Sequence, residues 1–494
     1  MKVLLINIFR SYGELGGSYS RVLAPMPPIT MAYLAAALER AGIDVEFFDD
    51  SLTRGDDAEL ERVLKRIAPD VVGLSLVTAT MAGAPRVIAA VRRHAPRARI
   101  VAGNIHAEVY CEPLLRSGQV DIVVIGEGEA TFPELVHALD KGTPALETVP
   151  GLSFLAEGRI VTTPPRTRLA DLDTLPFPAW HKFPMHRYRI LSFARVQDPG
   201  ILVLGSRGCP YNCSYCSLRV MGNVRRKRSA ANIADECEWV YEKFGIRQPS
   251  FVDAIFPFGK KEGLDYAAEL IRRGLHKRQV WITETRTDLV DLELLQALRE
   301  SGLRRLMFGF EAGDAEELAT LKKGASLGNA MKAVEICRKA GIQTVGFFML
   351  GVPGSTRESM QRNIQFARTL DLDFAKYTVF VPYPGTPLHD QLEAEGKILA
   401  PGDWKRYTTY PCREVPPVYV PDGFTAEEII ALQTKAHLSF YLRPSMIARQ
   451  LFQVRSLSLH DMADGLRTMA TVALRGRFQR NATGGAAGQG AGQA

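Results

Sequence analysis

The sequence predicts an α/β protein of two domains, each with a parallel sheet covered by helices. Short apolar runs alternate with amphipathic helical stretches over residues 1–145, and the same alternation returns over residues 199–400. Prolines accumulate in the intervening residues 146–198, which we interpret as a linker. With 494 residues the chain is long enough for two or three domains, each with its own core.

In the first domain we predict parallel strands at residues 3–8, 45–48, 71–76, 100–102 and 122–125. Ligands of such sheets bind beyond the carboxyl ends of the strands. Three of the loops at these ends carry small and hydroxylated residues, which let a large flat cofactor approach the backbone. The candidate cofactor-binding residues are Ser75, Thr78, Gly103, His106, Gly126, Glu127 and Gly128. Alternatively, Glu127 and Glu129 form an N-cap pair for the following helix.

In the second domain we predict strands at residues 201–204, 250–255, 281–283, 305–310, 344–350 and 374–381. Strands that alternate with helices in this way predict an open parallel barrel, with its active site at the carboxyl ends of the strands. Arginine offers a planar bidentate donor for a carboxylate, and carboxylates accept hydrogen bonds from ribose hydroxyls or an ammonium group. Polar or glycine residues at these strand ends are Asp253, Arg286, Glu311 and Gly351. Any charged one of them could instead form a salt bridge between loops.

Three cysteines, Cys209, Cys213 and Cys216, lie within eight residues at the end of the first barrel strand. Structural zinc sites use four ligands, and the nearest further cysteine, Cys237, lies downstream in a predicted helix. A cubane iron–sulfur cluster tolerates three cysteines, because its remaining iron is then open to another ligand. A zinc knuckle, or cysteines without a metal, remain the alternatives.

The cysteine spacing, with Tyr215 just before the last cysteine, resembles the cluster motif of the radical S-adenosylmethionine (SAM) enzymes. The resemblance implies a [4Fe-4S] cluster on Cys209, Cys213 and Cys216, whose open iron binds SAM and cleaves it to a 5′-deoxyadenosyl radical. It also implies SAM contacts from Asp253 to the ammonium, from Arg286 to the carboxylate and from Glu311 to the ribose. Family members often have two successive acidic residues where this chain has Asp253 followed by Ala254.

The loops of the first domain, taken together, resemble the cobalamin-binding domain that precedes the barrel in one branch of this family. The implied architecture is a flavodoxin-like (Rossmann-type) cobalamin-binding domain over residues 1–145, then a partial (β/α)6 TIM-like radical SAM barrel over 199–400. The Asp-x-His-x2-Gly motif that offers a histidine to cobalt is absent. His106 lies near the expected site, as a cobalt ligand or as a hydrogen-bonding residue of the loop.

The resemblance implies that this enzyme methylates an unactivated carbon of a small-molecule substrate, such as a secondary metabolite, a lipid or a tetrapyrrole. The first alternative is oxidative cyclisation or another radical rearrangement without methyl transfer, as in the anaerobic magnesium-protoporphyrin ester cyclases. The second is a cobalamin or redox sensor. We expect an electron donor such as flavodoxin or ferredoxin as partner, and no motif assigns a catalytic residue.

Composition and charge indicate a cytoplasmic protein. No apolar run reaches the roughly 18 to 20 residues that cross a bilayer, and clustered cysteines suit a reducing compartment. The net charge of +7 is uneven, because residues 443–480 hold seven Arg and two Asp. Apolar residues at helical spacing in this segment favour a helix packed on the barrel, or contact with an anionic membrane, rather than nucleic-acid binding.

Two further segments carry simple predictions. We predict a small, mainly helical C-terminal region over residues 401–480, followed by a disordered Gly/Ala-rich tail over 481–494. The basic run at residues 225–228 follows the cysteines. It could neutralise anionic groups of a substrate, but we interpret it as a solvated turn.

Overall fold

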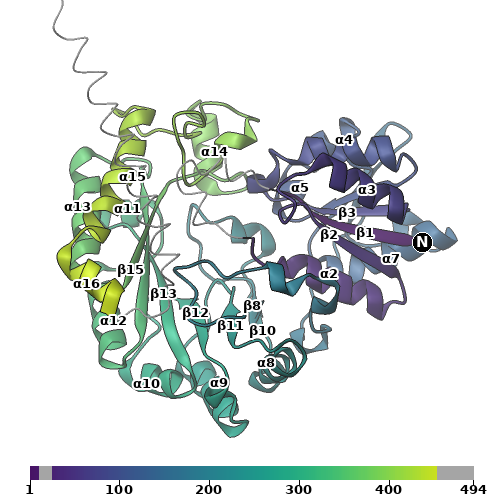
Figure 1. Ribbon diagram of the computed structural model, residues 1–494. Helices are drawn as coiled ribbons and strands as arrows, with labels where there is room; N and C mark the ends of the chain where they lie inside the picture. Colours follow the sequence, from purple (N-terminus) through teal and green to yellow (C-terminus); the bar gives the residue numbers. More distant parts are fainter. Residues whose placement is uncertain (10–24, 453–494) are drawn as a thin grey trace, which may run out of the picture.

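The first sheet has seven strands in the order β2-β1-β3-β4-β5-β6-β7 in the computed structural model, which describes residues 1–9 and 25–452 (Figure 1). Strands β1 to β5 pair in parallel in the flavodoxin-like order 2-1-3-4-5, which confirms the predicted fold class. Their bounds are β1 Lys2–Asn7, β2 Asp44–Asp49, β3 Val71–Ser75, β4 Arg99–Gly103 and β5 Ile122–Val124.

Alternating side chains of β1 divide the apolar core of this domain between the two faces of the sheet. Val3 and Leu5 belong to the cluster that includes residues of helices α2 and α7, whereas Leu4 and Ile6 pack with α3 and α4. The helices of this domain are α2 Ile29–Arg40, α3 Asp57–Ile67, α4 Ala84–His94, α5 Ile105–Val109, α6 Cys111–Arg116 and α7 Gly128–Lys141.

The segment 146–198, predicted as a linker, adds two antiparallel strands to this sheet. They are β6 (Leu152–Ala156), which pairs with β5, and β7 (Arg159–Thr162), which pairs with β6. Pro150 and Pro164 lie just outside the two strands. The prolines therefore lie at the two ends of this pair of strands. The density of prolines in the segment concealed the short alternating pattern of the strands.

The second sheet has six strands, all parallel, in the order β15-β14-β13-β12-β11-β8. Apart from the edge strands, each strand has its sequence neighbours on either side, which confirms the predicted open barrel. The bounds are β8 Gly200–Val203, β11 Gln248–Phe251, β12 Trp281–Thr285, β13 Leu303–Glu311, β14 Gln343–Leu350 and β15 Phe374–Val379. The hairpin of β9 (Ser206–Arg207) and β10 (Arg226–Lys227) flanks the cysteine segment.

Helices surround the outside of this barrel (Figure 1). Most of them connect successive strands, and α15 and α16 lie beside β15 at the open edge. Their bounds are α8 Ala230–Phe244, α9 Lys260–Arg272, α10 Leu292–Glu300, α11 Ala315–Thr320, α12 Leu327–Lys339, α13 Arg357–Thr369, α14 Pro387–Ala394, α15 Ala426–Tyr441 and α16 Pro444–Phe452.

The start of the arginine-rich C-terminal segment packs on the barrel. Arg449 of α16 donates to the backbone oxygen of Leu372 at 3.1 Å and pairs with the Asp371 carboxylate at 2.5 Å. The rest of this segment, 453–480, and the predicted tail 481–494 lie outside the described residues. Within the described part of the chain, no helix is both long and apolar enough to cross a membrane.

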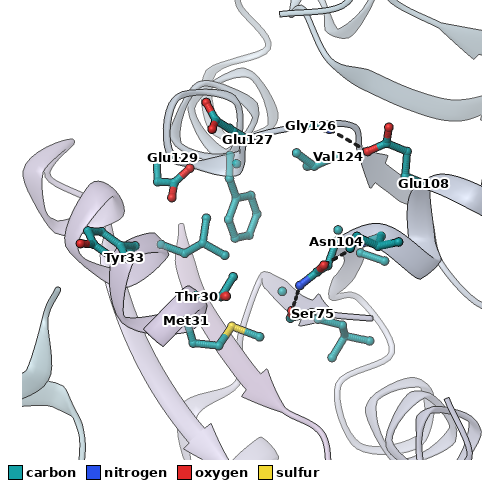
Figure 2. A pocket seen from close by; sticks show the side chains of 18 of the residues that line it. Thr30, Met31, Tyr33, Ser75, Asn104, Glu108, Val124, Gly126, Glu127 and Glu129 are labelled. Carbon is teal, nitrogen blue, oxygen red and sulfur yellow. Dashed lines mark hydrogen bonds between the residues drawn. The ribbon is translucent and has the colours of Figure 1, made fainter. Parts of the chain in front are cut away.

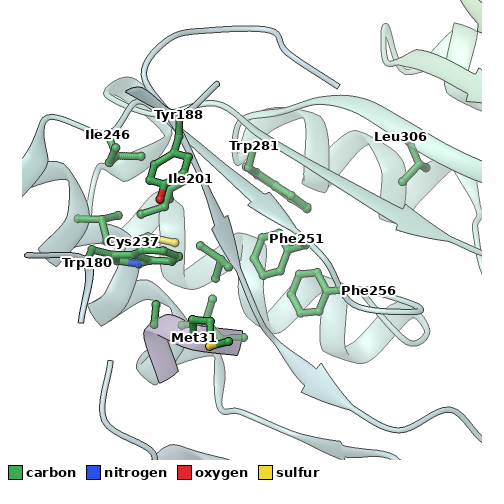
Figure 3. Close-up of a cluster of buried hydrophobic side chains, with 14 of the residues drawn as sticks. Met31, Trp180, Tyr188, Ile201, Cys237, Ile246, Phe251, Phe256, Trp281 and Leu306 are labelled. Carbon is green, nitrogen blue, oxygen red and sulfur yellow. The ribbon is translucent and has the colours of Figure 1, made fainter. Parts of the chain in front are cut away.

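The two domains share one apolar core, seen in Figure 3, where Met31 of α2 lies close to aromatic residues of the barrel. Trp180, from the segment between the sheets, is fully buried in this core. The rings of Phe251 and Phe256 stack at 4.1 Å. A continuous core resists relative movement of the domains, because separating them would expose large apolar side chains to water.

We expect Trp180→Ala to lower the free energy of unfolding by about 3 to 5 kcal/mol, since it leaves a large cavity where the domains meet. The indole Nε1 is buried without a hydrogen-bond partner in the structure, so Trp180→Phe should cost much less. Urea unfolding followed by circular dichroism measures both changes. A Trp180→Ala protein that unfolds at the wild-type urea concentration would contradict a shared core.

Candidate active site

The cysteine loop begins at the hairpin β9–β10, beyond the carboxyl end of β8. Gly208 has φ +83°, and a Cβ there would lie 2.3 Å from the backbone oxygen of Val224, so only glycine fits. Ser214 donates from its backbone N to Leu321 O at 3.0 Å and from Oγ to Thr320 O at 2.8 Å. These bonds attach the loop, at a point between its second and third cysteines, to the end of α11.

Cys209, Cys213 and Cys216 are partly buried free thiols at this strand end. Burial raises the pKa of Cys216 to about 11 and also raises that of Cys213, while the charges of Lys323 and Arg286 act to lower the pKa of Cys213. A cation bound between these cysteines would favour the thiolate form of Cys213 and Cys216, as the two basic side chains do for Cys213.

No three His, Cys, Asp or Glu side chains among the described residues converge closely enough to hold a single metal ion. A cubane cluster has a different requirement, because each cysteine binds a separate iron and the sulfurs stand further apart. The donor set of three thiols on one anchored loop therefore fits a cluster better than a single ion. Cys237 is fully buried in α8 and contacts the Tyr266 hydroxyl at 3.8 Å.

Glu311 and Tyr215, predicted separately, meet beside the cysteines. The Tyr215 hydroxyl donates to Glu311 Oε1 at 2.9 Å, and Lys323 Nζ pairs with the same oxygen at 2.5 Å. Glu311 ends β13 with φ +67°, at a break in the register with β14. This strained backbone directs the carboxylate toward the cysteine loop, so barrel and loop are fastened at this point.

Arg286 follows β12 and forms a salt bridge with Asp288 of its own loop, not the predicted alternative of a salt bridge between loops. Its Nε and Nη2 donate to the two carboxylate oxygens of Asp288 at 2.9 and 3.0 Å, and its Nη1 donates to Lys323 O at 2.9 Å. The guanidinium also lies 3.8 Å from the ring centroid of Tyr211 in the cysteine loop. One face of the guanidinium therefore packs on the cysteine loop.

Asp253, after β11, is buried and supports the backbone where the cysteine segment begins. It accepts hydrogen bonds from Gly205 N at 2.9 Å and from Ser206 Oγ at 2.5 Å. Burial raises its pKa to about 6, although these hydrogen bonds act to lower it. Gly351 directly follows β14 with φ +79°, near Pro421, and it lines neither of the cavities described below.

Sequence reasoning missed Glu284, a partly buried residue of β12. Burial raises its pKa to about 7, and the charges of Lys323 and Lys376 oppose that rise. The available sequence signal was the alternation along β12, where Glu284 lies between two threonines. Thr283 and Thr285 are buried and donate to the backbone oxygens of Phe256 and Pro257. A carboxyl group with this pKa can hold or release a proton near neutral pH.

The first domain contains a cavity of about 250 Å³ between the carboxyl edge of its sheet and helices α2 and α7 (Figure 2). A Cβ on Gly128 would lie 2.9 Å from Leu34, and one on Gly73 would lie 2.7 Å from Leu5, so glycines keep this space open. Asn104 donates to Ser75 Oγ at 3.0 Å on its rim. The predicted residues that line it are Ser75, Gly103, Gly126, Glu127 and Gly128.

Thr78 and His106 line neither this cavity nor the one between the domains. His106 is 1% exposed, and its Nδ1 lies 3.1 Å from Thr78 Oγ1. Its ring stacks on Tyr110 at 4.7 Å and meets the edge of Trp404 at 4.6 Å. Burial lowers the pKa of His106 to about 4, so the imidazole is neutral and packed as a hydrogen-bonding residue.

Glu127 and Glu129 form ion pairs with the hairpin that carries the cysteines. Glu127 accepts hydrogen bonds from Arg226 at 2.6 and 2.9 Å and lies 3.3 Å from Arg207, which also pairs with Glu129. All four side chains are between 11% and 15% exposed. Glu127 stands at the N-cap position of α7 and Glu129 lies in its first turn, as the alternative prediction had them, but the Glu127 side chain makes no capping bond because the hairpin arginines occupy its carboxylate.

The prediction that residues 225–228 form a solvated turn is wrong. Arg225 donates to both carboxylate oxygens of Glu262 at 2.8 and 2.6 Å, and Arg228 pairs with Glu236 in the interior. Of the four basic residues in this run, Lys227 keeps a mostly exposed side chain, at 56%. Buried charges require partners, and helices α8 and α9 supply them.

A second cavity, of about 470 Å³, lies between the two domains. It shares Thr30, Ser75 and Asn104 with the first cavity and reaches Lys376 of β15 on the barrel side. The sequence motifs do not include the barrel residues of this wall. The shared residues place the two cavities next to each other.

We expect Glu127→Gln to lower the free energy of unfolding by about 1.5 to 3 kcal/mol, because it leaves the hairpin arginines without their charged acceptor. The exposed pair of Glu61 and Lys65 is the control, and Glu61→Gln should change stability little. Burial alone would raise the pKa of Glu127, but the bonds from Arg226 and the charge of Arg207 lower it overall.

The difference between wild type and Glu127→Gln should therefore be complete above the ordinary pKa of 4.5 and disappear as the pH falls through the lower pKa of the folded state. Urea unfolding at several pH values measures it. A difference that grows on acidification would be inconsistent with this ion pair.

Residues 20–136 match the family model of the B12 binding domain, and residues 203–367 match that of the radical SAM superfamily. The chain is 32% identical to an uncharacterised methyltransferase of Pyrococcus horikoshii over 442 residues, which cover 89% of this chain and 93% of that protein. It is 27% identical to the anaerobic magnesium-protoporphyrin IX monomethyl ester cyclase of Cereibacter sphaeroides over 455 residues, 90% of this chain and 71% of that protein.

Among solved structures, the fold is similar to that of the radical SAM methyltransferase TsrM of Kitasatospora setae. The TM-score is 0.70 at 19% identity, and the match covers 98% of this chain and 99% of that one. At this identity the likeness shows the fold. The relative from Pyrococcus horikoshii and the two family models span both domains described above. The chain therefore belongs to the cobalamin-binding radical SAM enzymes.

Proposed function

We propose that this enzyme transfers a methyl group to an unactivated carbon of a small-molecule substrate, using a [4Fe-4S] cluster, SAM and cobalamin. The observation that carries the proposal is the joining of two sites. The cysteine loop and the glycine-lined cavity meet through the ion pairs of Arg207 and Arg226 with Glu127 and Glu129.

Cys209, Cys213 and Cys216 would hold the cluster, and residues beside them would orient SAM. Glu311 is suited to accept hydrogen bonds from ribose hydroxyls, since its position is set by Tyr215 and Lys323. Arg286 is suited to the SAM carboxylate, with Asp288 fixing the plane of its guanidinium. Asp253 is the candidate for the SAM ammonium. When bound, these groups and cobalamin supply one-electron reduction and a transferable methyl group.

The cavity of the first domain is suited to the planar base and nucleotide of cobalamin, because glycines and apolar side chains form most of its wall. The packing of His106 supports a cobalamin site in which this loop supplies no ligand to cobalt. It is buried behind Tyr110 and Trp404 and is already bonded to Thr78. We further propose that flavodoxin or ferredoxin supplies the electron.

Oxidative cyclisation is the second candidate reaction. It is favoured by the 27% identity to a magnesium-protoporphyrin ester cyclase over 90% of this chain. A cyclase of this kind would use the same cofactor sites without transferring a methyl group. The two candidates therefore differ in the fate of the SAM methyl group and in the residues that contact the substrate.

We expect Cys209→Ala, Cys213→Ala and Cys216→Ala each to abolish the visible absorbance of the anaerobically reconstituted cluster. Cys237→Ala is the matched control, since that thiol is fully buried in α8, and it should keep the full iron content. Iron and sulfide analysis together with circular dichroism measures the outcome. Loss of the cluster in a normally folded Cys237→Ala protein would refute the model of three cysteine ligands.

With SAM labelled in its methyl group, we expect label to move first to bound cobalamin, leaving S-adenosylhomocysteine, and then to a product from a small-molecule extract of the source cells. Glu311→Gln should weaken SAM binding about tenfold, because a charged acceptor is lost. Mass spectrometry follows label and 5′-deoxyadenosine together. Formation of 5′-deoxyadenosine with turnover but no labelled product would reject methyl transfer and favour the cyclase-type reaction.

A further inference from the structure

Arg168 stands at the rim of the glycine-lined cavity, although it comes from the segment between the two sheets. In the part of the chain that the structure describes, its side chain forms no hydrogen bond and no ion pair. Arg207, the other basic residue in the lining, is paired with Glu127 and Glu129. Arg168 therefore brings an uncompensated positive charge to this cavity.

The backbone on both sides of Arg168 is attached to neighbouring elements. On one side, Arg166 Nε donates to Thr131 Oγ1 of α7 at 2.7 Å. On the other, the backbone oxygen of Leu169 accepts a hydrogen bond from Arg226 of the β9–β10 hairpin at 2.7 Å. The position of Arg168 beside the cavity is therefore fixed by bonds that do not involve its own side chain.

The guanidinium of Arg168 lies against Gly222, in the segment that follows the three cysteines. Gly222 has φ +96°, and a Cβ at this position would overlap the guanidinium. Both the backbone conformation and the neighbouring arginine therefore favour glycine here. The contact places the free charge where the rim of the cavity meets the cysteine segment.

The acidic residues of the cavity do not neutralise Arg168. Glu127 and Glu129 are engaged by Arg207 and Arg226. Glu108 of α5 accepts a hydrogen bond from the backbone N of Gly126 at 3.3 Å (Figure 2). Among the described residues, no ion pair joins Glu108 to Arg168, so the guanidinium remains available to an anionic group of a ligand.

We propose that Arg168 binds the phosphodiester of the cobalamin nucleotide. The inference rests on the proposed function, in which this cavity takes the base and nucleotide of cobalamin. The phosphodiester is the anionic group of that molecule, since the side chains of its corrin ring are neutral amides. A guanidinium can donate two parallel hydrogen bonds to phosphate oxygens, and it keeps its charge at every pH at which the protein is folded.

The test uses the full-length protein with its cluster reconstituted, and three corrinoids. Hydroxocobalamin has the whole nucleotide, cobinamide has neither phosphate, ribose nor base, and cobinamide phosphate has the phosphate without ribose and base. Ultrafiltration followed by the visible absorbance of the corrin gives the Kd of each.

We expect Arg168→Met to raise the Kd of hydroxocobalamin and of cobinamide phosphate about tenfold, and to leave that of cobinamide unchanged. Arg168→Lys should lose less affinity, because an ammonium group still binds phosphate as a point charge. Arg159→Met is the matched control. Arg159 is an exposed arginine of β7 in the same sheet and lines neither cavity, so this variant should bind all three corrinoids as wild type does.

Three outcomes would overturn the phosphate contact and leave the proposed function intact. In the first, wild type and Arg168→Met bind every corrinoid equally. In the second, Arg168→Met weakens cobinamide as much as hydroxocobalamin, which would assign Arg168 to the corrin ring. In the third, hydroxocobalamin is weakened but cobinamide phosphate is not, which would assign it to the ribose or the base.

Failure of the wild-type protein to bind hydroxocobalamin, with normal iron content, has a different meaning. It would refute the cofactor role of the cavity in the proposed function, and the phosphate contact with it. Circular dichroism of each variant shows that a change in Kd does not come from unfolding.

Discussion

The arrangement of the two sites depends on the ion pairs between the β9–β10 hairpin and the start of α7. Arg207 directly precedes Gly208 and Cys209, and Glu127 directly precedes Gly128 in the wall of the first cavity. One group of charges therefore ties the cysteine loop to the pocket in the other domain. Removing one partner would leave a charge poorly solvated, so the hairpin and the pocket must keep their spacing.

Charged side chains at the mouth of the barrel are also held by neighbouring polar groups. Glu311 is held by Tyr215 and Lys323, and Arg286 by Asp288, so these groups are oriented before any ligand arrives. Preorganised polar groups in a site that excludes water interact with a ligand more strongly than they would in solution.

Relatives with different reactions match this chain over most of its length, which agrees with an architecture that supports more than one radical reaction. The cofactor-side residues stand at strand ends, where the fold determines their positions. The wall of the cavity between the domains is assembled instead from residues 25–31, from β15 and from residues 408–410.

The sequence by itself determined the parallel strands of both sheets, the cysteine loop and the glycines at the strand ends, because these follow from local alternation, spacing and backbone geometry. Only the tertiary structure decided the partners of charged residues: Arg226 and Glu127 are 99 positions apart, so their pairing had no local signal. Tertiary packing also decided the burial of Arg225 and Arg228, the packing of His106 under Trp404, and the aromatic surroundings of Lys376. In each case the contact between separate elements, not periodicity, determines the environment of the side chain.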